Sequence, residues 1–293
     1  MNGWLLVDKP SGISSHDVVQ RVRGIIPGCR IGHTGTLDPL ATGLLVLGIG
    51  NTTRLSEYLI SQSKQYTAVV RLGATTTTFD AEGDIMSEKD VKIGAAAIES
   101  ILPTFIGCIE QVPPIYSAIK IGGERAYKLA RSGKTVKMSP RSVRIDKLAI
   151  VDYCSPDITL EISCSSGTYV RSLAHDLGQS IGCGAHLLCL RRDVVGPFSL
   201  HQSYQLEDIE QTNDSCEVSS LLLPSGDAMV GWQKMCLGAD DVGKIRHGNS
   251  VIGSGCVSET LALAYDVEGE LIAVLEGQPE LGRWQPRKVL MSK

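Results

Sequence analysis

A long stretch near the start of the chain carries a single charge. Between Arg30 and Arg54 the only formally charged side chain is Asp38, among glycines, threonines and apolar residues. An ionised carboxylate in a dry site needs a cationic partner to stay charged. If Asp38 is buried, the fold must therefore bring a cation to it from another segment.

The local sequence leaves two interpretations of Asp38 open. Asp-Pro before "LATGLL" is a good helix start, with Asp38 as the N-cap and Pro39 at the first helical position. Alternatively, the carboxylate faces a ligand. The surrounding glycines permit close backbone approach by a bound molecule, and His33, Thr34 and Thr36 add polar groups around it.

Nucleotide and metal motifs are missing from the sequence. "GHTGTLDP" lacks the spacing and the lysine of a phosphate-binding loop, and "GIGNTT" lacks the third glycine of a dinucleotide fingerprint. The nine cysteines form no CxxC pair and no zinc-like cluster with histidine. We expect reduced thiols, no metal and no cofactor.

A length of 293 residues suits one large domain, or a medium domain with a small one. No run approaches the 18 or so apolar residues of a transmembrane helix. The N-terminus has acidic Asp8 and a proline–glycine turn where a signal peptide would need its apolar core. We expect a cytoplasmic protein without membrane contact.

Periodicity and capping residues predict helices and strands without a strict βαβ rhythm. Ser14 is expected to cap a helix over 14–26, with Asp17 in a capping-box position. Thr168 is expected to cap a second helix, over 167–182, that stops at Gly182. Further helices are predicted over 92–107, up to Pro103, and over 124–133, ending at Gly133. Strands are predicted over 66–73, 157–164 and 185–192, with a turn into another at 78–85 and a hairpin over 261–277.

Charge is separated along the chain, although the total is only −4. Residues 115–147 hold nine basic and two acidic side chains, whereas residues 203–242 hold one basic and eight acidic ones. The basic region could bind a phosphate backbone while the acidic one faces away, although a merely solvated face is the alternative. The polar, turn-rich segment 203–228 marks our domain boundary, with a small all-β domain after it.

Six blocks now carry a resemblance. In order they are "DKPSGISSHDVV", "GHTGTLDPLATGLL", "KQYTAVVRLG", "PPIYSAIK", "SSGTYVRSLAHDLG" and "GCGAHLLCLRR". Together they resemble the TruB family of tRNA pseudouridine synthases over about residues 4–200, and "KIRHGN" and "RWQPRKV" resemble a PUA-like domain. The resemblance implies a mixed α/β (α+β) pseudouridine synthase fold with a largely antiparallel central sheet over 1–228. A small PUA-like RNA-binding β-domain over 229–293 would follow it.

The resemblance also implies catalytic roles. Asp38 matches the family's catalytic carboxylate, Arg171 matches the arginine that pairs with it, and Tyr66 matches the tyrosine that stacks on the target base. A carboxylate can attack the sugar, attack the base or start an elimination, and the sequence does not choose between these routes.

Other positions match the family's substrate contacts. Tyr169 and Leu190 match residues that line the uridine pocket, and His33 matches the histidine at the RNA loop. Lys9 and Pro10 match a block that supports the active-site loop.

By the same resemblance, the substrate is the uridine at position 55 in the T-loop of tRNA, flipped out of its stack into the pocket. The basic insertion at about 115–147 would contact phosphates, and the C-terminal domain the acceptor end of the tRNA. Expected contacts are Lys120, Arg125, Lys128 and Arg131 in the insertion, and Arg246, Arg287 and Lys288 in the C-terminal domain.

Three rival functions remain. The protein could be mainly an RNA-binding or RNA-folding factor, and assistance with tRNA folding is also compatible with catalysis. A glycoside-type hydrolase usually needs two carboxylates, and the region of Asp38 supplies one. A guide-RNA-dependent relative would carry an extra N-terminal segment, so we favour a stand-alone monomer without guide RNA or an obligate protein partner.

Overall fold

The computed structural model describes residues 1–117, 119–132, 137–212, 215–252 and 260–291. One large sheet has the strand order β14-β1-β3-β12-β4-β11-β10-β7, with β2 added to β3 and β13 to β12. Its strands are β1 (Gly3–Lys9), β2 (Ile31–His33), β3 (Thr42–Ile49), β4 (Lys64–Leu72), β7 (Gly107–Gln111), β10 (Arg141–Cys154), β11 (Asp157–Cys164), β12 (Ala185–Val195), β13 (Phe198–Ser199) and β14 (Tyr204–Gln205). The β1–β14 and β12–β3 pairs are parallel and the other described pairs are antiparallel, which confirms the predicted fold class.

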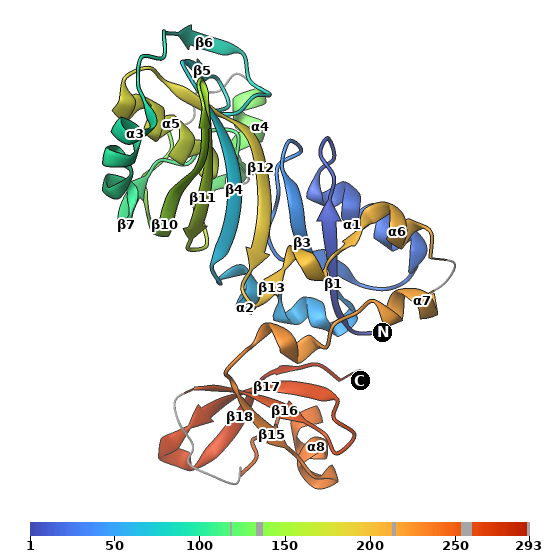
Figure 1. Cartoon of the computed structure of the whole chain (residues 1–293). Helices are drawn as coiled ribbons and strands as arrows, with labels where there is room; N and C mark the ends of the chain where they lie inside the picture. The colour runs from blue at the N-terminus through green and yellow to red at the C-terminus, as the bar shows by residue number, and fades with distance from the viewer. Residues whose placement is uncertain (118, 133–136, 213–214, 253–259, 292–293) are drawn as a thin grey trace.

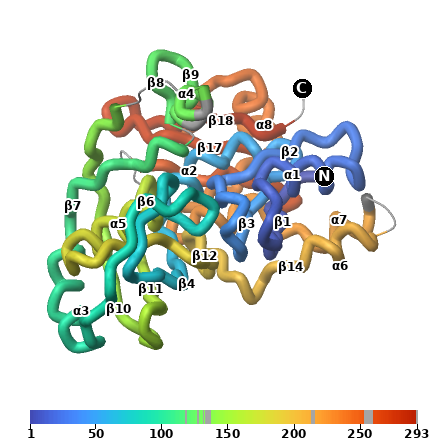
Figure 2. The backbone as a smooth tube through the Cα atoms, turned by 90° about the horizontal axis from the view of Figure 1, so that it is seen from above, coloured from blue at the N-terminus to red at the C-terminus, as the bar shows by residue number. Residues whose placement is uncertain are grey.

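Most helices of this part cover one face of the sheet, whereas Leu59 of the short helix after β3 packs in the core on the opposite face. The apolar residues of the covering helices join side chains of β1, β3, β4 and β11 in one core, and α5 packs directly on β12 (Figure 1). The helices of this part are α1 (Ser15–Ile25), α2 (Ser56–Ile60), α3 (Ala95–Ile101), α4 (Ala126–Arg131), α5 (Val170–Ile181), α6 (Leu206–Glu210) and α7 (Ser215–Ser220). Two small hairpins are β5 (Ala74–Thr76) with β6 (Ile85–Glu88), and β8 (Lys120–Ile121) with β9 (Glu124–Arg125). Seen from above, β8, β9 and α4 lie together at the rim of the molecule (Figure 2).

Strands β1 and β3 are buried on both faces. Along β1, Leu5 and Val7 join the core under the helices, whereas Trp4 and Leu6 join a second core on the opposite face. The residues of β3 alternate between the same two cores. A strand covered on both sides reads as a continuous apolar run, which explains why the stretch after Asp38 is uncharged.

The interpretation of Asp38 as a helix N-cap is wrong. The chain makes a turn after Asp38 and continues into β3. Gly43 has a φ of 95°, and a Cβ atom there would lie 2.4 Å from the carbonyl oxygen of Arg192. The close approach of β3 and β12 holds the chain after Asp38 in a strand. Tertiary packing therefore overrides the helix-start signal of Asp38 and Pro39.

The predicted helix at the N-terminus is confirmed. Ser14 is the N-cap of α1, and the capping box with Asp17 is present. The predicted strands correspond to β4, β11 and β12, and the turn at 78–85 joins β5 to β6. The helix predicted over 92–107 is α3, which ends before Pro103. The short basic helix is α4, and its predicted end, Gly133, lies outside the described residues.

The predicted cap of α5 needs a correction. The N-cap is Tyr169 without a side-chain bond, and the Thr168 hydroxyl donates instead to the carbonyl of Ser165 at 3.0 Å. The side chain of Gln111 satisfies Tyr169 from another strand: Nε2 donates to its carbonyl at 3.0 Å, and Oε1 accepts from its N–H at 2.8 Å. The helix stops at Gly182, in the left-handed region with φ 91°, as predicted.

The acidic segment 203–228 packs against the large sheet. Strand β14 joins the edge of that sheet, and Leu206 and Ile209 of α6 are fully buried in its core. The placement of a domain boundary at residue 228 stays a prediction.

A second sheet lies beyond this segment (Figure 1). Its strand order is β15-β16-β17-β18, in which β16 and β17 form the predicted hairpin. The strands are β15 (Gln233–Cys236), β16 (Leu261–Tyr265), β17 (Leu271–Gln278) and β18 (Arg283–Val289). The expectation that this part is all-β is wrong, because α8 (Ala239–Arg246) packs Ile245 into its core. Two acidic residues in the first turn of α8 and two basic ones in its last turn suit the helix dipole, a signal that the sequence contained.

The two sheets share one apolar core. Trp4, Leu6 and Leu44 pack in the same cluster as Leu263 and Val274 of the second sheet. Polar contacts add to this junction: Asn51 Nδ2 donates to the Leu290 carbonyl at 2.5 Å, and Lys288 Nζ to the Arg54 carbonyl at 2.8 Å. Because the core is continuous, we expect the two sheets to move as one body.

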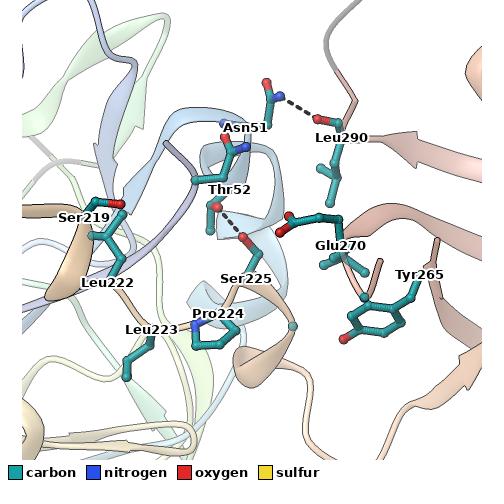
Figure 3. Close-up of a pocket in the computed structure, with 14 residues that line it drawn as sticks. Asn51, Thr52, Ser219, Leu222, Leu223, Pro224, Ser225, Tyr265, Glu270 and Leu290 are labelled. Atoms are coloured by element: carbon teal, nitrogen blue, oxygen red, sulfur yellow. Dashed lines mark hydrogen bonds between the residues drawn. The ribbon is translucent and has the colours of Figure 1, made fainter. Parts of the chain in front are cut away.

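A pocket of about 320 Å³ lies in the junction (Figure 3). The hydroxyls of Thr52 and Ser225 meet in it at 2.5 Å, and Tyr265 and Glu270 line its other side. Among its described lining residues none is Lys, Arg or His. We assign no ligand to it.

Glycine at position 178 allows α5 to approach β12. A Cβ atom there would lie 2.1 Å from the backbone nitrogen of Ala185. We predict that Gly178→Ala lowers the free energy of unfolding by about 3 kcal/mol, because the overpacked helix must shift. Thermal and urea unfolding measure the effect. The matched control is Gly243→Ala in α8, where nothing lies within 4 Å and stability should rise by about 0.5 kcal/mol. Equal effects of the two substitutions would contradict the close approach.

Candidate active site

A pocket of about 470 Å³ opens beside the loop that carries Asp38. Strands β4 and β12, the start of α5 and the segment after β7 form its other walls. Its lining residues include Thr34, Gly35, Thr36, Leu37, Asp38, Ile60, Lys64, Tyr66, Ser117, Ser165, Ser166, Thr168, Tyr169, Arg171, Leu190 and Arg192. Five of the predicted site residues thus line one pocket: Asp38, Tyr66, Tyr169, Arg171 and Leu190.

Arg171 is the cation that the lone carboxylate requires. Its Nη2 lies 3.0 Å from Oδ2 of Asp38, and its side chain is 6% exposed while that of Asp38 is 39% exposed. Loss of hydration in the pocket raises the pKa of Asp38, the Arg171 charge lowers it, and nearby Asp80 raises it further. The net direction is upward, so Arg171 compensates only part of the cost of ionising Asp38 there.

A second carboxylate shares the same guanidinium. Asp80 is 2% exposed, and its Oδ2 lies 3.2 Å from Nη1 of Arg171. The backbone N–H of Glu82 donates to Asp80 Oδ1 at 3.1 Å, and the Thr78 hydroxyl donates to the same oxygen. Arg171 Nη2 also donates to the carbonyl of Tyr116 at 2.9 Å. Arg171 is therefore held from three segments, and its orientation toward Asp38 is fixed.

The loop before β3 is held by the N-terminal segment. Lys9 is fully buried and donates to three carbonyls, those of Pro10 at 2.8 Å, Ile13 at 2.7 Å and Pro39 at 3.3 Å. Burial lowers the pKa of Lys9 to about 8. Contact with the Pro39 carbonyl ties this lysine to the residue next to Asp38, in agreement with the supporting role that the resemblance implied.

Buried cations also line the far wall of the pocket. Arg192 is 3% exposed and donates to the carbonyls of Leu44 at 2.8 Å and Gly35 at 3.1 Å. Its guanidinium faces the hydroxyl of Tyr66, whose pKa is raised by burial and lowered by Arg192. Lys64 is 6% exposed, bonds to two carbonyls and has a pKa lowered to about 8 by burial.

His33 lies at the end of β2, outside the residues that line the pocket. Its Nδ1 is buried without a partner among the described residues, and burial lowers the pKa of the ring. The neutral ring can therefore donate or accept a hydrogen bond at this position.

The predicted RNA contacts lie elsewhere on the surface. Lys120, Arg125 and Lys128 are exposed on β8, β9 and α4, whereas the side chain of Arg131 is outside what the structure describes. In the second sheet's domain, Arg246 and Arg287 are exposed, and Arg287 pairs with Glu276 at 3.3 Å. Lys288 instead pairs with Glu57 at 2.6 Å across the junction, so its ammonium group is already occupied.

Sequence reasoning missed four residues of the site. Lys64, Ser117 and Arg192 lie within blocks that carry the family resemblance, but none of them was singled out as a site residue. Asp80 lies outside those blocks, and only the structure marks it, through its ion pair with Arg171 and the positive φ of 65° at the preceding residue, Phe79. A non-glycine residue in that region often accompanies a functional turn.

This arrangement suits chemistry at a carboxylate. A half-exposed Asp38 stands at the pocket wall, a fixed guanidinium stabilises its charge, and two tyrosine rings provide flat apolar surfaces. Such a carboxylate can act as a nucleophile or as a base. The pocket is large enough for a single nucleoside but not for a folded RNA stem.

Comparisons with known proteins agree along the whole chain. The model of the TruB family pseudouridylate synthase (N terminal domain) matches residues 23–170, and that of the tRNA pseudouridylate synthase B C-terminal domain matches residues 171–230. The chain is 42% identical over 295 residues to a tRNA pseudouridine synthase B of Pseudomonas aeruginosa (strain UCBPP-PA14), covering 100% of this chain and 97% of that protein. It is 39% identical over 296 residues to the protein of the same name from Stutzerimonas stutzeri (strain A1501), with the same coverage.

Solved structures share the fold. A chain in the crystal structure of a Cbf5-Nop10-Gar1 complex superimposes with a TM-score of 0.74 at 24% identity, covering 99% of this chain and 85% of that one. At this identity the likeness supports the fold alone. Within the described residues, no helix is both long enough and apolar enough to cross a membrane.

The buried ion pair of Asp80 generates a prediction about stability. Asp80→Ala should destabilise the protein by about 3 kcal/mol, because the Arg171 guanidinium then keeps a carboxylate only on its pocket side. The control is Asp157→Ala, which removes the partly exposed pair with Arg71 and should cost below about 1 kcal/mol. Urea unfolding of both variants measures the two losses of stability. A loss for Asp80→Ala no larger than that for Asp157→Ala would contradict the role of Asp80 as an anchor of Arg171.

The raised pKa of Asp38 generates a prediction about pH. A raised folded-state pKa means that the folded protein binds this proton more tightly than the unfolded chain. Ionisation of Asp38 therefore opposes folding increasingly as the pH rises from about 4. We expect Asp38→Asn to raise the Tm at pH 7, with a gain that vanishes toward pH 4. Thermal unfolding across this range measures the gain, and a lower Tm of the variant at pH 7 would show that the ion pair outweighs desolvation.

Proposed function

The chain belongs to the TruB family of pseudouridylate synthases, and we propose that it isomerises the uridine at position 55 in the T-loop of tRNA to pseudouridine. The observation that carries the proposal is the ion pair of Asp38 with buried Arg171 at the wall of a nucleoside-sized pocket. Full-length similarity to proteins named tRNA pseudouridine synthase B supports the same substrate class.

The base must leave its stack to reach Asp38. Unstacking costs a few kcal/mol, which contacts in the pocket must offset. Tyr66 and Leu190, each 9% exposed, face this pocket together with Tyr169 and supply the apolar and aromatic walls that a flipped base needs. His33, at the end of β2 next to the catalytic loop, is placed to contact the RNA loop that the uridine leaves.

The reaction moves one bond within the nucleotide. The bond from N1 of uracil to C1′ of ribose breaks, a bond from C5 to C1′ forms, C5 loses a proton and N1 gains one. Asp38 acts as the carboxylate that opens this sequence, by attack on the sugar or base or by removal of a proton. Arg171 keeps Asp38 charged and oriented, and Tyr66 lies across the pocket to handle the C5 proton.

The RNA-binding surface extends beyond the pocket. Lys120, Arg125 and Lys128 are exposed on the basic insertion, and we assign phosphate contacts to them together with Arg131. The second sheet, as a PUA-like domain over 229–293, would contact the acceptor end through Arg246 and Arg287. Its shared core with the catalytic part favours a fixed separation between the two contacts.

We further propose that the protein acts as a monomer in the cytoplasm, without guide RNA or an obligate protein partner. The relatives named tRNA pseudouridine synthase B match over 97% of their own length and support tRNA as the substrate, whereas the monomeric state and the compartment are proposed from the family resemblance.

The test of the function is release of tritium from tRNA labelled at uridine C5. The native protein should release about one equivalent per tRNA, and Asp38→Ala should release none above background, because the variant lacks the carboxylate that opens the reaction. A tRNA with the target uridine replaced should also release none.

A second outcome would favour a different function. If the native protein binds tRNA, releases no tritium and accelerates tRNA folding equally with and without Asp38→Asn, the protein is an RNA-folding factor. Release from the replaced tRNA would instead move the target to another uridine.

A further inference from the structure

One polar group in the pocket has no partner. Ser117 is 4% exposed and lines the pocket with Asp38 and Tyr66, yet its Oγ forms no hydrogen bond with any described residue. Buried hydroxyls in native proteins are almost always hydrogen-bonded, because an unpaired one loses its bonds to water without replacement. A bound ligand that supplies the missing partner removes this cost.

Hydrogen bonds hold the backbone before Ser117 in place. The carbonyl of Tyr116 accepts from Arg171 at 2.9 Å, and the carbonyl of Val112 accepts from the Ser172 hydroxyl at 2.7 Å. Gln111, at the end of β7, is bonded twice to Tyr169. The same guanidinium that faces Asp38 therefore also fixes the position of Ser117.

The nearest hydroxyl does not satisfy Ser117. Burial raises the pKa of Tyr169 and the Ser117 hydroxyl lowers it, so the two side chains are neighbours. No hydrogen bond of normal geometry joins them. Both residues line the pocket, and the Ser117 hydroxyl has no hydrogen-bond partner among the described residues.

We propose that the Ser117 hydroxyl hydrogen-bonds a polar edge of the flipped uracil base. This inference rests on the proposed function. It assigns a base-binding role to a residue at the start of the basic insertion, where the insertion meets the catalytic pocket.

Burial favours the base over the ribose as the partner. The ribose of a flipped nucleotide stays attached to the RNA strand through its phosphates, so the base enters first and reaches deepest. Ser117 is buried, whereas Asp38, which must meet the sugar–base bond, is only partly buried. The Ser117 hydroxyl, which is the more enclosed group, therefore meets the uracil base, which reaches deeper into the pocket than the sugar–base bond.

The experiment compares how the variant converts a substrate RNA with how tightly it binds a competing RNA that lacks the target base. One probe is a synthetic T-arm RNA hairpin with uridine at the target position, for which kcat/KM is measured. The other is the same hairpin with an abasic target nucleotide, used as a competitive inhibitor to obtain Ki. We expect Ser117→Ala to lower kcat/KM by about 3- to 10-fold, the loss of one neutral hydrogen bond, and to leave Ki unchanged.

A matched control is Ser100→Ala, an exposed serine of α3 that does not line the pocket. It should change neither quantity by more than about 2-fold. An unchanged kcat/KM in Ser117→Ala overturns the inference while leaving the function intact. An equal loss for both hairpins also overturns it, because the contact would then be with the sugar or the phosphates. No turnover by the native protein would contradict the proposed function itself.

Unfolding of the free protein supplies a second readout. Because the Ser117 hydroxyl is unpaired without substrate, Ser117→Ala should leave the Tm unchanged or raise it. A lower Tm would mean that the hydroxyl has a structural partner, and it would overturn the proposal.

Discussion

One guanidinium organises the site. Arg171 reaches Asp38 on the pocket side, Asp80 on the core side and the carbonyl of Tyr116 along the rim. Isolated burial of an arginine is expensive, and two carboxylates with a carbonyl offset that cost. The loop before β3, the β5–β6 hairpin and the root of the basic insertion are thereby linked through one side chain.

The electrostatics of the pocket follow from how the other cations are buried. Lys9, Lys64 and Arg192 are bonded mainly to backbone carbonyls, and no described carboxylate forms an ion pair with them. Carbonyls satisfy their donors but do not cancel their charge. The walls around Asp38 thus keep a local positive charge, which suits a polyanion although the net charge of the whole chain is negative.

The sequence foretold the local features of this fold better than its long-range ones. The capping box of Ser14, the alternation of β11 and the stop at Gly182 depend on neighbouring residues and are present as predicted. Strand β3 was missed because Asp38-Pro39 favours a helix start, and only packing against β12 selects the strand. The need of Asp38 for a cation followed from charge alone.

The rest of the site required more than local chemistry. That Arg171 is this cation came from the family resemblance, since 133 positions of sequence separate it from Asp38. Asp80 lies outside the blocks of the resemblance, and Ser117 lies in one of them without an assigned role, because the importance of both arises only when folding brings them to Arg171 and Tyr169. The order of strands has a consequence for synthesis on the ribosome. Strand β12, at residues 185–195, lies between β3 and β4, which are complete by residue 72. A growing chain therefore exposes two unpaired strand edges for more than a hundred residues, an aggregation hazard that chaperones must cover. A nascent chain that ends before β12 lacks part of the pocket wall. Chemistry at Asp38 therefore requires that nearly two thirds of the polypeptide has been synthesised.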